Sequence, residues 1–388
     1  MTELVRDRLS WMVYAQLGIY GYFLYGFGPT VPLLRNELGI DRTLSGLHGT
    51  ALAVGAIVAG LTGTTLIRRF GRALLLWAGI AGVCVGIVGY CSARALPLTL
   101  LSAMVCGTSG SFVVNTSNSV LMDAHGESGP AALSEANAAA GAAGTVAPLV
   151  VGAAVAVGLG WRAGLLVAVV LAAVVFGVFR TVRLPPPTVV EAAGRAGGAH
   201  SLPRRYWITW GVLVCVIATE FCLSLWATDL LRTRDDLGPG AATAGLSAVL
   251  VGMTVSRFAG GRLGLRRTVD WLLVRSMAVL LVGFAAFWAT TDAPVAFAAL
   301  GVCGLGLGML YPLTLGRAVA AAEGRSDLAA TRASLGAGAA IAVGPFLLGA
   351  LADQFGEHAA FLLVPLLIVA AGVGLAVSRP VAPVRQVP

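Results

Sequence analysis

A single carboxylate, Glu220, lies inside a long apolar segment of this sequence. From Tyr206 to Phe221 no other residue can carry a charge, and Asp229 is the next acid along the chain. A charge at the centre of a membrane helix costs about 2.5–3.5 kcal/mol on insertion scales, so such a residue usually faces a partner or a wet cavity. Because burial favours the neutral form of a carboxyl, Glu220 can hold a proton when occluded and release it when water enters. We therefore expect Glu220 to couple protons to transport; the alternative is a permanently neutral glutamate bonded to a neighbouring helix.

A second polar group recurs at helical spacing and could contact a solute. The spacings of 3, 4 and 3 place four residues on one helix face: Thr108, Ser111, Asn115 and Asn118. Amides that faced lipid would be unsatisfied, so we expect Asn115 and Asn118 to face a cavity and bind substrate. Hydrogen bonding between helices explains the same pattern equally well.

Tyrosines mark a third candidate surface. The segment 11–33 holds four of the seven tyrosines; Tyr14, Gly18, Tyr22 and Tyr25 share one helix face, and Gln16 and Tyr20 share the other. We expect Tyr22 and Tyr25 to meet the cavity, with Tyr311 of a later segment as a further substrate-binding residue. Aromatic walls with hydroxyl groups suit sugars and flat cations alike.

The elements that must position these residues are membrane-spanning helices. The chain has 388 residues, 57% of them hydrophobic and 11% charged. Apolar runs of about 20 residues recur, which is the length that a helix needs to cross a bilayer, and continuous runs favour helices over a barrel. The runs predict twelve spans, with cores near 11–33, 45–66, 73–92, 96–121, 131–157, 162–180, 206–231, 241–262, 269–290, 294–316, 328–350 and 359–378. The predicted fold class is thus an all-α membrane protein.

The chain divides into two related halves. A Pro-, Gly- and Arg-rich segment, 181–205, indicates a cytoplasmic linker between six-helix bundles at 1–180 and 206–388. Gly141/Gly338, Pro148/Pro345 and Gly152/Gly349 are each 197 residues apart, and so are Glu135 and Arg332. Two pseudo-symmetric bundles around a central site are the architecture of a rocking transporter. Opposite charges at Glu135 and Arg332 could form a gate, although two solvated surface charges are nearly as good an explanation.

The placement of charge indicates orientation and excludes several functions. All 26 basic residues are Arg; six lie in alternate loops and twenty at the opposite helix ends or the termini, which places both termini in the cytoplasm. This pattern argues against nucleic acid as a partner. The six cysteines and four histidines show no metal or redox spacing, so we expect neither a metal nor a cofactor. Arg-only usage indicates a GC-rich bacterial genome and hence a bacterial inner membrane.

Motifs in this arrangement resemble the major facilitator superfamily. That family has a signature Gly-x-Leu-Ala-Asp-Arg-x-Gly-Arg after helix two, and this chain matches it at Leu66, Arg69, Gly71 and Arg72, while Arg68 replaces the acid. A weaker counterpart follows helix eight near Arg257. The resemblance implies a twelve-helix carrier with gating roles for Arg69, Arg72, Glu135, Arg257 and Arg332.

Helix seven is similar to the fucose-permease-like branch of that family. Glu220 lies six residues ahead of Trp226, which is the spacing of that branch, and the resemblance implies that Trp226 contacts substrate. The helix-one acid of the branch is absent, and Ser256 replaces the usual Gly.

The sequence therefore predicts a proton-coupled carrier of a small neutral or cationic organic solute that works by alternating access. A dedicated anion carrier is disfavoured because no Arg lies at the middle of a helix. Proton-driven efflux of drugs or metabolites and proton-independent facilitation remain open alternatives. A membrane receptor or enzyme would need a sensor domain or a catalytic group of residues, and neither is found. We expect a monomer in the lipid bilayer.

Overall fold

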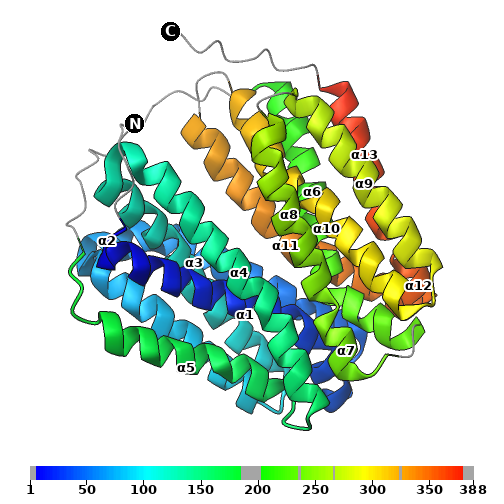
Figure 1. Ribbon diagram of the computed structural model, residues 1–388, viewed down its shortest axis with the longest axis horizontal. Helices are drawn as coiled ribbons and strands as arrows, with labels where there is room; N and C mark the ends of the chain where they lie inside the picture. Colours follow the sequence, from blue (N-terminus) through cyan, green and yellow to red (C-terminus); the bar gives the residue numbers. More distant parts are fainter. Residues whose placement is uncertain (1–5, 185–201, 235–236, 265–266, 323–325, 379–388) are drawn as a thin grey trace. The chain divides into compact units, whose positions relative to one another are not determined.

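The protein, seen here as a computed structural model, is built from helices (Figure 1). The structure describes residues 6–184, 202–234, 237–264, 267–322 and 326–378. In chain order the elements are α1 (Arg8–Leu38), α2 (Arg42–Ser92), α3 (Leu96–His125), η1 (Gly126–Ser128), α4 (Gly129–Ala156), α5 (Trp161–Phe179), α6 (Arg204–Arg234), α7 (Pro239–Ala244), α8 (Leu246–Gly264), α9 (Val269–Ala289), α10 (Ala293–Ala320), α11 (Ser326–Phe355), α12 (Glu357–Ala360) and α13 (Leu363–Val377).

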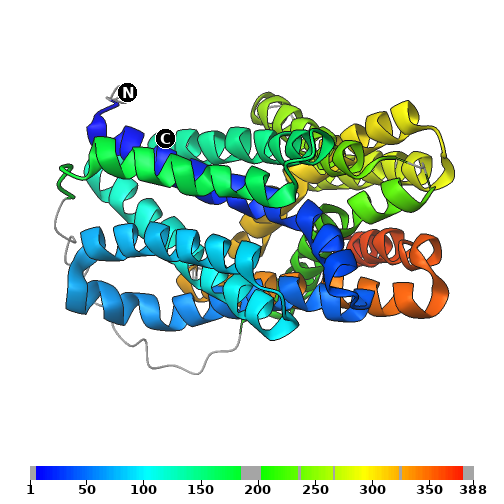
Figure 2. The same cartoon turned by 90° about the horizontal axis from the view of Figure 1, so that it is seen from below.

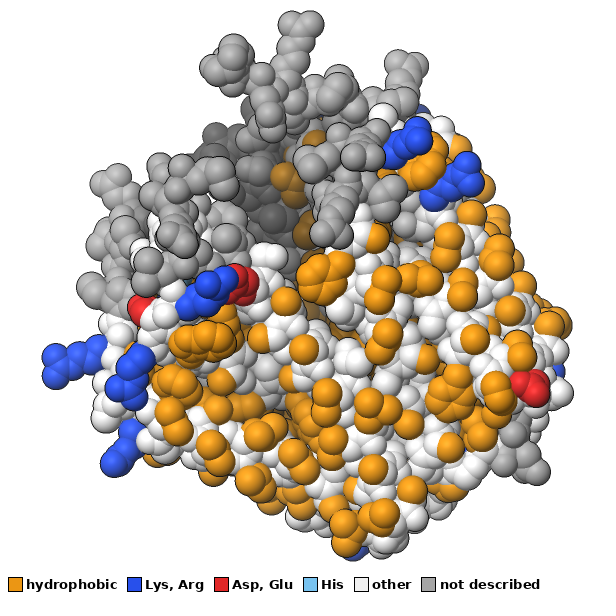
Figure 3. Space-filling view, in the orientation of Figure 1, with side chains coloured by type: hydrophobic (Ala, Val, Ile, Leu, Met, Phe, Trp, Pro, Cys, Tyr) orange, Lys and Arg blue, Asp and Glu red, His pale blue; other side chains and the backbone are white. Residues whose placement is uncertain are grey.

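These helices confirm the predicted membrane spans. Within the described residues, 11 helical segments are long and apolar enough to cross a membrane. They correspond to the second to twelfth predicted spans. The first predicted span is α1, which is 31 residues long and less apolar because of its tyrosines and Gln16. Figure 3 shows hydrophobic side chains over much of the face that it draws, as expected of a surface that contacts lipid.

The second and third predicted spans form one continuous element, α2, with a break at Gly71. The backbone of Gly71 has φ 80° and ψ 163°, a conformation that glycine adopts without steric cost. The break therefore falls inside the signature segment that the sequence singled out. Asp41 begins α2 by accepting a hydrogen bond from the main-chain N–H of Leu44 at 2.7 Å.

The internal repeat is visible in how the helices cross. A Cβ atom on Gly107 of α3 would lie 2.1 Å from the main-chain oxygen of Leu52 in α2. A Cβ atom on Gly304 of α10 would lie 1.9 Å from the main-chain oxygen of Val249 in α8. Both glycines and both oxygens are 197 residues apart, the same separation as the sequence repeat. The two halves therefore use the same glycine-mediated backbone approach.

The chain forms two compact units, each described by itself below. Unit 1 contains residues 1–197 and 224–247, and unit 2 contains residues 198–223 and 248–388, so α6 contributes to both. The bundle boundaries predicted at 180 and 206 stay a prediction. Most of the predicted linker, residues 185–201, lies outside the described residues.

In unit 1, α1 lies at the centre of the packing. Figure 2 shows α1 in dark blue running diagonally between α5 in green and the two arms of α2 in light blue. Phe27 of α1 packs on Tyr90 of α2 with ring centroids 5.0 Å apart, and Tyr90 packs on Trp161 of α5 at 5.5 Å. These contacts fix the helix that carries the predicted tyrosines.

Candidate functional site

In unit 2 Glu220 and Tyr311 lie within electrostatic range of each other. Glu220 lies on α6 with its side chain partly buried, flanked by Thr219 and Cys222, which are fully buried. Tyr311 of α10 is 38% exposed and lies within electrostatic range of the Glu220 carboxyl group. A phenol can donate a hydrogen bond to an ionised carboxylate and accept one from a neutral carboxyl. The pair is therefore suited to a group that changes its protonation state.

The two tyrosines predicted to bind substrate have different environments in unit 1. The Tyr22 hydroxyl donates to the main-chain oxygen of Gly164 in α5 at 2.7 Å, and the side chain is buried. Tyr22 thus ties α1 to α5. Tyr25 is partly exposed, and its ring lies over Gly144 of α4, where a Cβ atom would come within 2.5 Å. Of the two, Tyr25 keeps accessible surface.

The predicted amide stripe lies on the accessible face of α3. Asn115 is exposed and Asn118 is partly exposed, whereas Thr116 and Ser117 on the other face are buried. Trp226 lies in the part of α6 that belongs to unit 1, and its side chain is 2% exposed. The asparagines thus keep accessible surface in this structure, while Trp226 is packed.

The signature segment, which lies within α2, forms an ion pair that the sequence analysis did not predict. A terminal nitrogen of Arg72 lies 2.5 Å from a carboxylate oxygen of Asp123 at the end of α3. Arg69 is exposed, with its guanidinium 5.2 Å from the ring centroid of Phe70. Asp123 was detectable as the acid nearest to the end of predicted span four.

Glu135, predicted as half of a gate, is paired within unit 1. Its carboxylate oxygens accept from Arg6 at 2.6 and 2.9 Å, and the Tyr14 hydroxyl donates to it at 3.2 Å. The pair is well exposed, with side-chain accessibilities of 51% for Arg6 and 35% for Glu135. It joins the start of α1 to the first turns of α4.

A second polar link joins the start of α1 to the end of α3. Asp7 caps α1 by accepting from the Ser10 N–H at 2.8 Å and the Ser10 hydroxyl at 2.7 Å, and that hydroxyl also lies 2.8 Å from His125 Nε2. Burial acts to raise the pKa of Asp7, but the two bonds from Ser10 and the nearby His125 outweigh it and lower the pKa below its ordinary value.

The remaining predicted gate residues lie in unit 2. Arg257 of α8 is exposed and its Nε donates to the main-chain oxygen of Gly308 in α10 at 3.3 Å. The side chain of Arg332 is exposed, and its main-chain oxygen accepts from the indole N–H of Trp210 at 2.8 Å. Both arginines keep charged groups at an accessible surface.

Arg35 and Asp229 form a buried ion pair at the end of unit 1 that lies far from the N-terminus. The Asp229 carboxylate of α6 accepts from both terminal nitrogens of Arg35 in the last turn of α1, one of them at 2.9 Å. The two side chains are 10% and 2% exposed. The Nε of Arg42 lies 3.6 Å from the same carboxylate. The sequence analysis named Asp229 as an acid but gave no local signal to join it to Arg35.

Close backbone approaches surround this ion pair. A Cβ atom on Gly28 of α1 would lie 2.6 Å from the main-chain oxygen of Ser224 in α6, and one on Gly152 of α4 would lie 2.5 Å from that of Gly240 in α7. The Ser247 hydroxyl donates to the main-chain oxygen of Thr145 at 2.8 Å. The small residues let α6 and α7 lie directly on α1 and α4 at this end.

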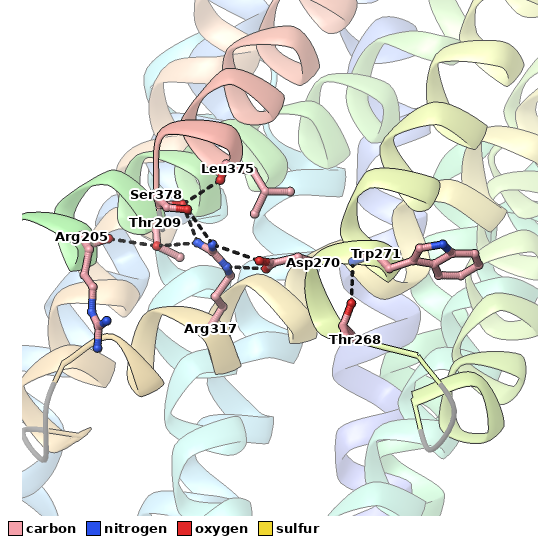
Figure 4. Close-up of polar contacts among 8 residues, drawn as sticks. All are labelled: Arg205, Thr209, Thr268, Asp270, Trp271, Arg317, Leu375 and Ser378. Atoms are coloured by element: carbon pink, nitrogen blue, oxygen red, sulfur yellow. Dashed lines mark hydrogen bonds and ion pairs between the residues drawn. The ribbon is translucent and has the colours of Figure 1, made fainter. Parts of the chain in front are cut away.

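Unit 2 has a buried arginine of its own (Figure 4). Arg317 of α10 is 4% exposed and donates to Asp270 at 2.7 Å, to Thr209 at 3.2 Å and to the Ser378 hydroxyl at 2.6 Å. These partners belong to α9, to α6 and to the residue that follows α13. The network holds four segments together, and the carboxylate of Asp270 balances the buried charge.

Helices of this length and apolarity define a multi-pass membrane carrier. Residues 13–325 match the model of the major facilitator superfamily, and the chain belongs to that family. It is a secondary transporter rather than an enzyme. No curated protein sequence matches the chain significantly.

Solved structures of transporters share this fold. A bacterial homolog of the human lysosomal transporter Spinster, in an inward-facing and occupied conformation, matches with a TM-score of 0.79 and 14% identity over 97% of both chains. The nucleoside transporter NupG matches with a TM-score of 0.76 and 13% identity over 95% of this chain and 98% of that one. The comparisons do not support the narrower resemblance of helix seven to the fucose-permease-like branch.

Proposed function

We propose that this protein is a proton-coupled secondary transporter that moves a small neutral or cationic organic solute by alternating access. One observation carries the proposal: Glu220, an acid in the middle of a membrane helix, keeps part of its side chain accessible and lies within electrostatic range of the Tyr311 phenol. Intramembrane acids are functional by default because their burial is costly. Alternating hydration would let Glu220 bind and release H⁺, which is the requirement for coupling.

The pairing of the buried arginines indicates the charge of the solute. Arg35, Arg72 and Arg317, the arginines held most deeply in their units, each pair with a carboxylate. An anionic solute would need an uncompensated cation, and these pairs supply none. A neutral or cationic solute fits better. Nucleosides, which the similar transporter NupG carries by name, belong in the same test panel as sugars, amines and antibiotics.

We assign solute contact to the accessible residues among those predicted. Tyr25 and Tyr311 offer aromatic faces, and Asn115 and Asn118 offer amide donors and acceptors. In this conformation Tyr22 and Trp226 are buried, so a contact from either needs the helices around it to move.

Alternating access requires gates, and the charged residues of helix ends supply candidates. Arg35 with Asp229 would close the end of unit 1 that lies far from the N-terminus, which the charge asymmetry places outside the cell. Arg69, Arg72 and Arg257 would act at the opposite side.

Glu135 with Arg332 is the gate proposed from the repeat. Glu135→Arg alone and Arg332→Glu alone are expected to slow transport, because each reversal would place like charges together in the state in which the proposed gate closes. The double reversal is expected to restore it, and failure of that rescue removes the pair from the gate.

The experiment that tests the function starts with a thermal-shift screen of the purified full-length protein against the panel. A solute that raises the unfolding midpoint is then followed in proteoliposomes with and without an imposed pH gradient. We expect the gradient to drive accumulation by the native protein and Glu220→Gln to abolish the drive. Asp292→Asn is the matched control, because it removes an exposed carboxylate at the start of α10 and keeps a side chain that can cap the helix.

The outcomes also separate the alternatives. Uptake with the proton gradient indicates symport, and uptake against it indicates antiport and therefore efflux in the cell. Transport that ignores the gradient in both the native protein and Glu220→Gln would refute proton coupling and leave a facilitator. We place the protein in a bacterial inner membrane as a monomer with both termini in the cytoplasm.

A further inference from the structure

A groove on the surface of unit 1 lies between the third membrane span and the end of α5. Its volume is about 530 Å³, and it is lined by Ala73, Leu74, Trp77, Phe176, Arg180 and Thr181. The Trp77 and Phe176 rings form its aromatic floor, edge to face with centroids 5.3 Å apart. Leu74 and Phe176 are about half exposed. The groove is therefore apolar and open at the outer surface of the helices. One cation, Arg180, lies at its end.

Helical spacing aligns the apolar and charged parts of the groove. Arg180 lies four residues after Phe176, so it follows one turn further along the same face of α5. The span ends at Phe179, which places Arg180 and Thr181 where the hydrocarbon region gives way to lipid headgroups. A molecule in the groove would meet aromatic rings at the depth of its chain and a guanidinium at the depth of its headgroup.

The charge around Arg180 is positive and uncompensated by the described part of the chain. Arg180 and Arg183 are exposed, and neither is paired with a carboxylate among the described residues. Arg8 of α1 adds a third cation at this end of α5, because it donates to the main-chain oxygen of Val178 at 3.1 Å. Arg180 lines the groove and Arg183 follows it at the same end of α5, so the complementary ligand is an anion.

We propose that this groove binds an anionic phospholipid, with the phosphate on Arg180 and Thr181 and an acyl chain across Leu74, Trp77 and Phe176. Arg recognises phosphate through paired N–H groups, and the Thr181 hydroxyl supplies another donor. Basic pockets between helices on the cytoplasmic side are suited to acidic lipid headgroups. The lipid is a structural ligand of the outer surface, and the proposal is independent of the transported solute.

The volume of the groove limits how much of the lipid it can hold. A groove of about 530 Å³ is the size of a small-molecule site, so it receives the headgroup and the first part of one chain. The chain would continue along Ala173 and Val169, which lie on the same face of α5 as Phe176 and follow it away from Arg180 at intervals of about one turn. The net negative charge of the headgroup therefore supplies selectivity, because a zwitterionic lipid carries the same phosphate beside a cation, and the apolar floor holds the chain.

Native mass spectrometry of the full-length protein in detergent tests this site. The probes are dioleoylphosphatidylglycerol and dioleoylphosphatidylcholine at equal concentration. We expect the native protein to retain the anionic lipid in preference, and Arg180→Gln to weaken that retention about fivefold, the effect of one arginine near an acidic headgroup. Phosphatidylcholine retention should change less in that variant, because the choline cation offsets the attraction of its phosphate to Arg180.

Two further variants keep the test specific. Arg94→Gln removes the same charge from an exposed position at the other end of unit 1 and should bind lipid as the native protein does. Phe176→Ala should weaken retention of both lipids, because it removes part of the floor. Equal binding by Arg180→Gln and the native protein would overturn the proposal, and so would displacement of the lipid by soluble glycerol phosphate, which carries the headgroup charge without a chain.

Discussion

Removing one partner of the Arg35–Asp229 ion pair should destabilise the protein far more than removing both. Asp229→Asn leaves the Arg35 guanidinium buried and without its counter-charge, with Arg42 3.6 Å from the same position. The side chains are 10% and 2% exposed, so water cannot replace the lost carboxylate. Breaking a buried pair in this way costs about 3–5 kcal/mol.

The size of the effect comes from desolvation as much as from attraction. At 2.9 Å, with an effective dielectric constant of about 20, the attraction between two unit charges is about 6 kcal/mol. Desolvation costs several kcal/mol for each ion, so the net value of the pair against two apolar side chains is near zero. Arg35→Met combined with Asp229→Leu should therefore be more stable than either single change.

Thermal unfolding of the purified variants in detergent measures their relative stabilities. Glu135→Gln is the matched control, because its partner Arg6 is 51% exposed and pairs of that kind contribute about 0–1 kcal/mol. We expect Asp229→Asn to lower the unfolding midpoint strongly and Glu135→Gln to change it little. Equal shifts for the two variants, or a double variant as unstable as Asp229→Asn, would refute the desolvation argument.

Four other substitutions, with Gly141→Ala as a control, test the packing and the charges of the two units by the same thermal unfolding assay. Gly107→Ala and Gly304→Ala should each destabilise the protein by about 1–3 kcal/mol, because the new methyl group would lie 2.1 and 1.9 Å from a main-chain oxygen. Gly141→Ala is the control: its methyl group meets nothing within 4 Å, so it should be neutral or stabilising. Arg317→Met should cost about 1–3 kcal/mol, since it removes the buried donor to Asp270, Thr209 and Ser378, whereas the Asp270 carboxylate that it leaves is 35% exposed and stays hydrated. Asp7 has a lowered pKa in the folded protein. Its ionised carboxylate therefore contributes to folding stability above the unfolded pKa of about 3.9, and this contribution is lost as pH falls through the folded pKa. Asp7→Asn should reduce the fall of the unfolding midpoint below about pH 4.

Local pattern was sufficient to predict the helices and their symmetry. The length and apolarity of each run fix a span without reference to its neighbours, which is why the predicted spans agree with α1 to α13. The 197-residue repeat, found from glycine and proline positions, recurs in the crossing of Gly107 over Leu52 and Gly304 over Val249. The break at Gly71 likewise follows from a local requirement for glycine.

The partners of polar side chains were not predictable in the same way. Arg35 and Asp229 are 194 residues apart, and no spacing rule relates the ends of helices so distant in the chain. Periodicity placed Tyr22 and Tyr25 on one face of α1, but only the packing of α5 shows that the Tyr22 hydroxyl is bonded to Gly164. The repeat paired Glu135 with Arg332, whereas the structure pairs Glu135 with Arg6, a terminal residue with no motif.

The central claim, that Glu220 takes up and releases a proton, can be measured without knowing the solute. Infrared spectra of the native protein in liposomes, recorded while pH is changed, report the carbonyl band of each carboxyl group as it ionises. We predict one carboxyl band that changes as pH is changed and that is absent from Glu220→Gln. Identical titrations of the native protein and Glu220→Gln would contradict the account.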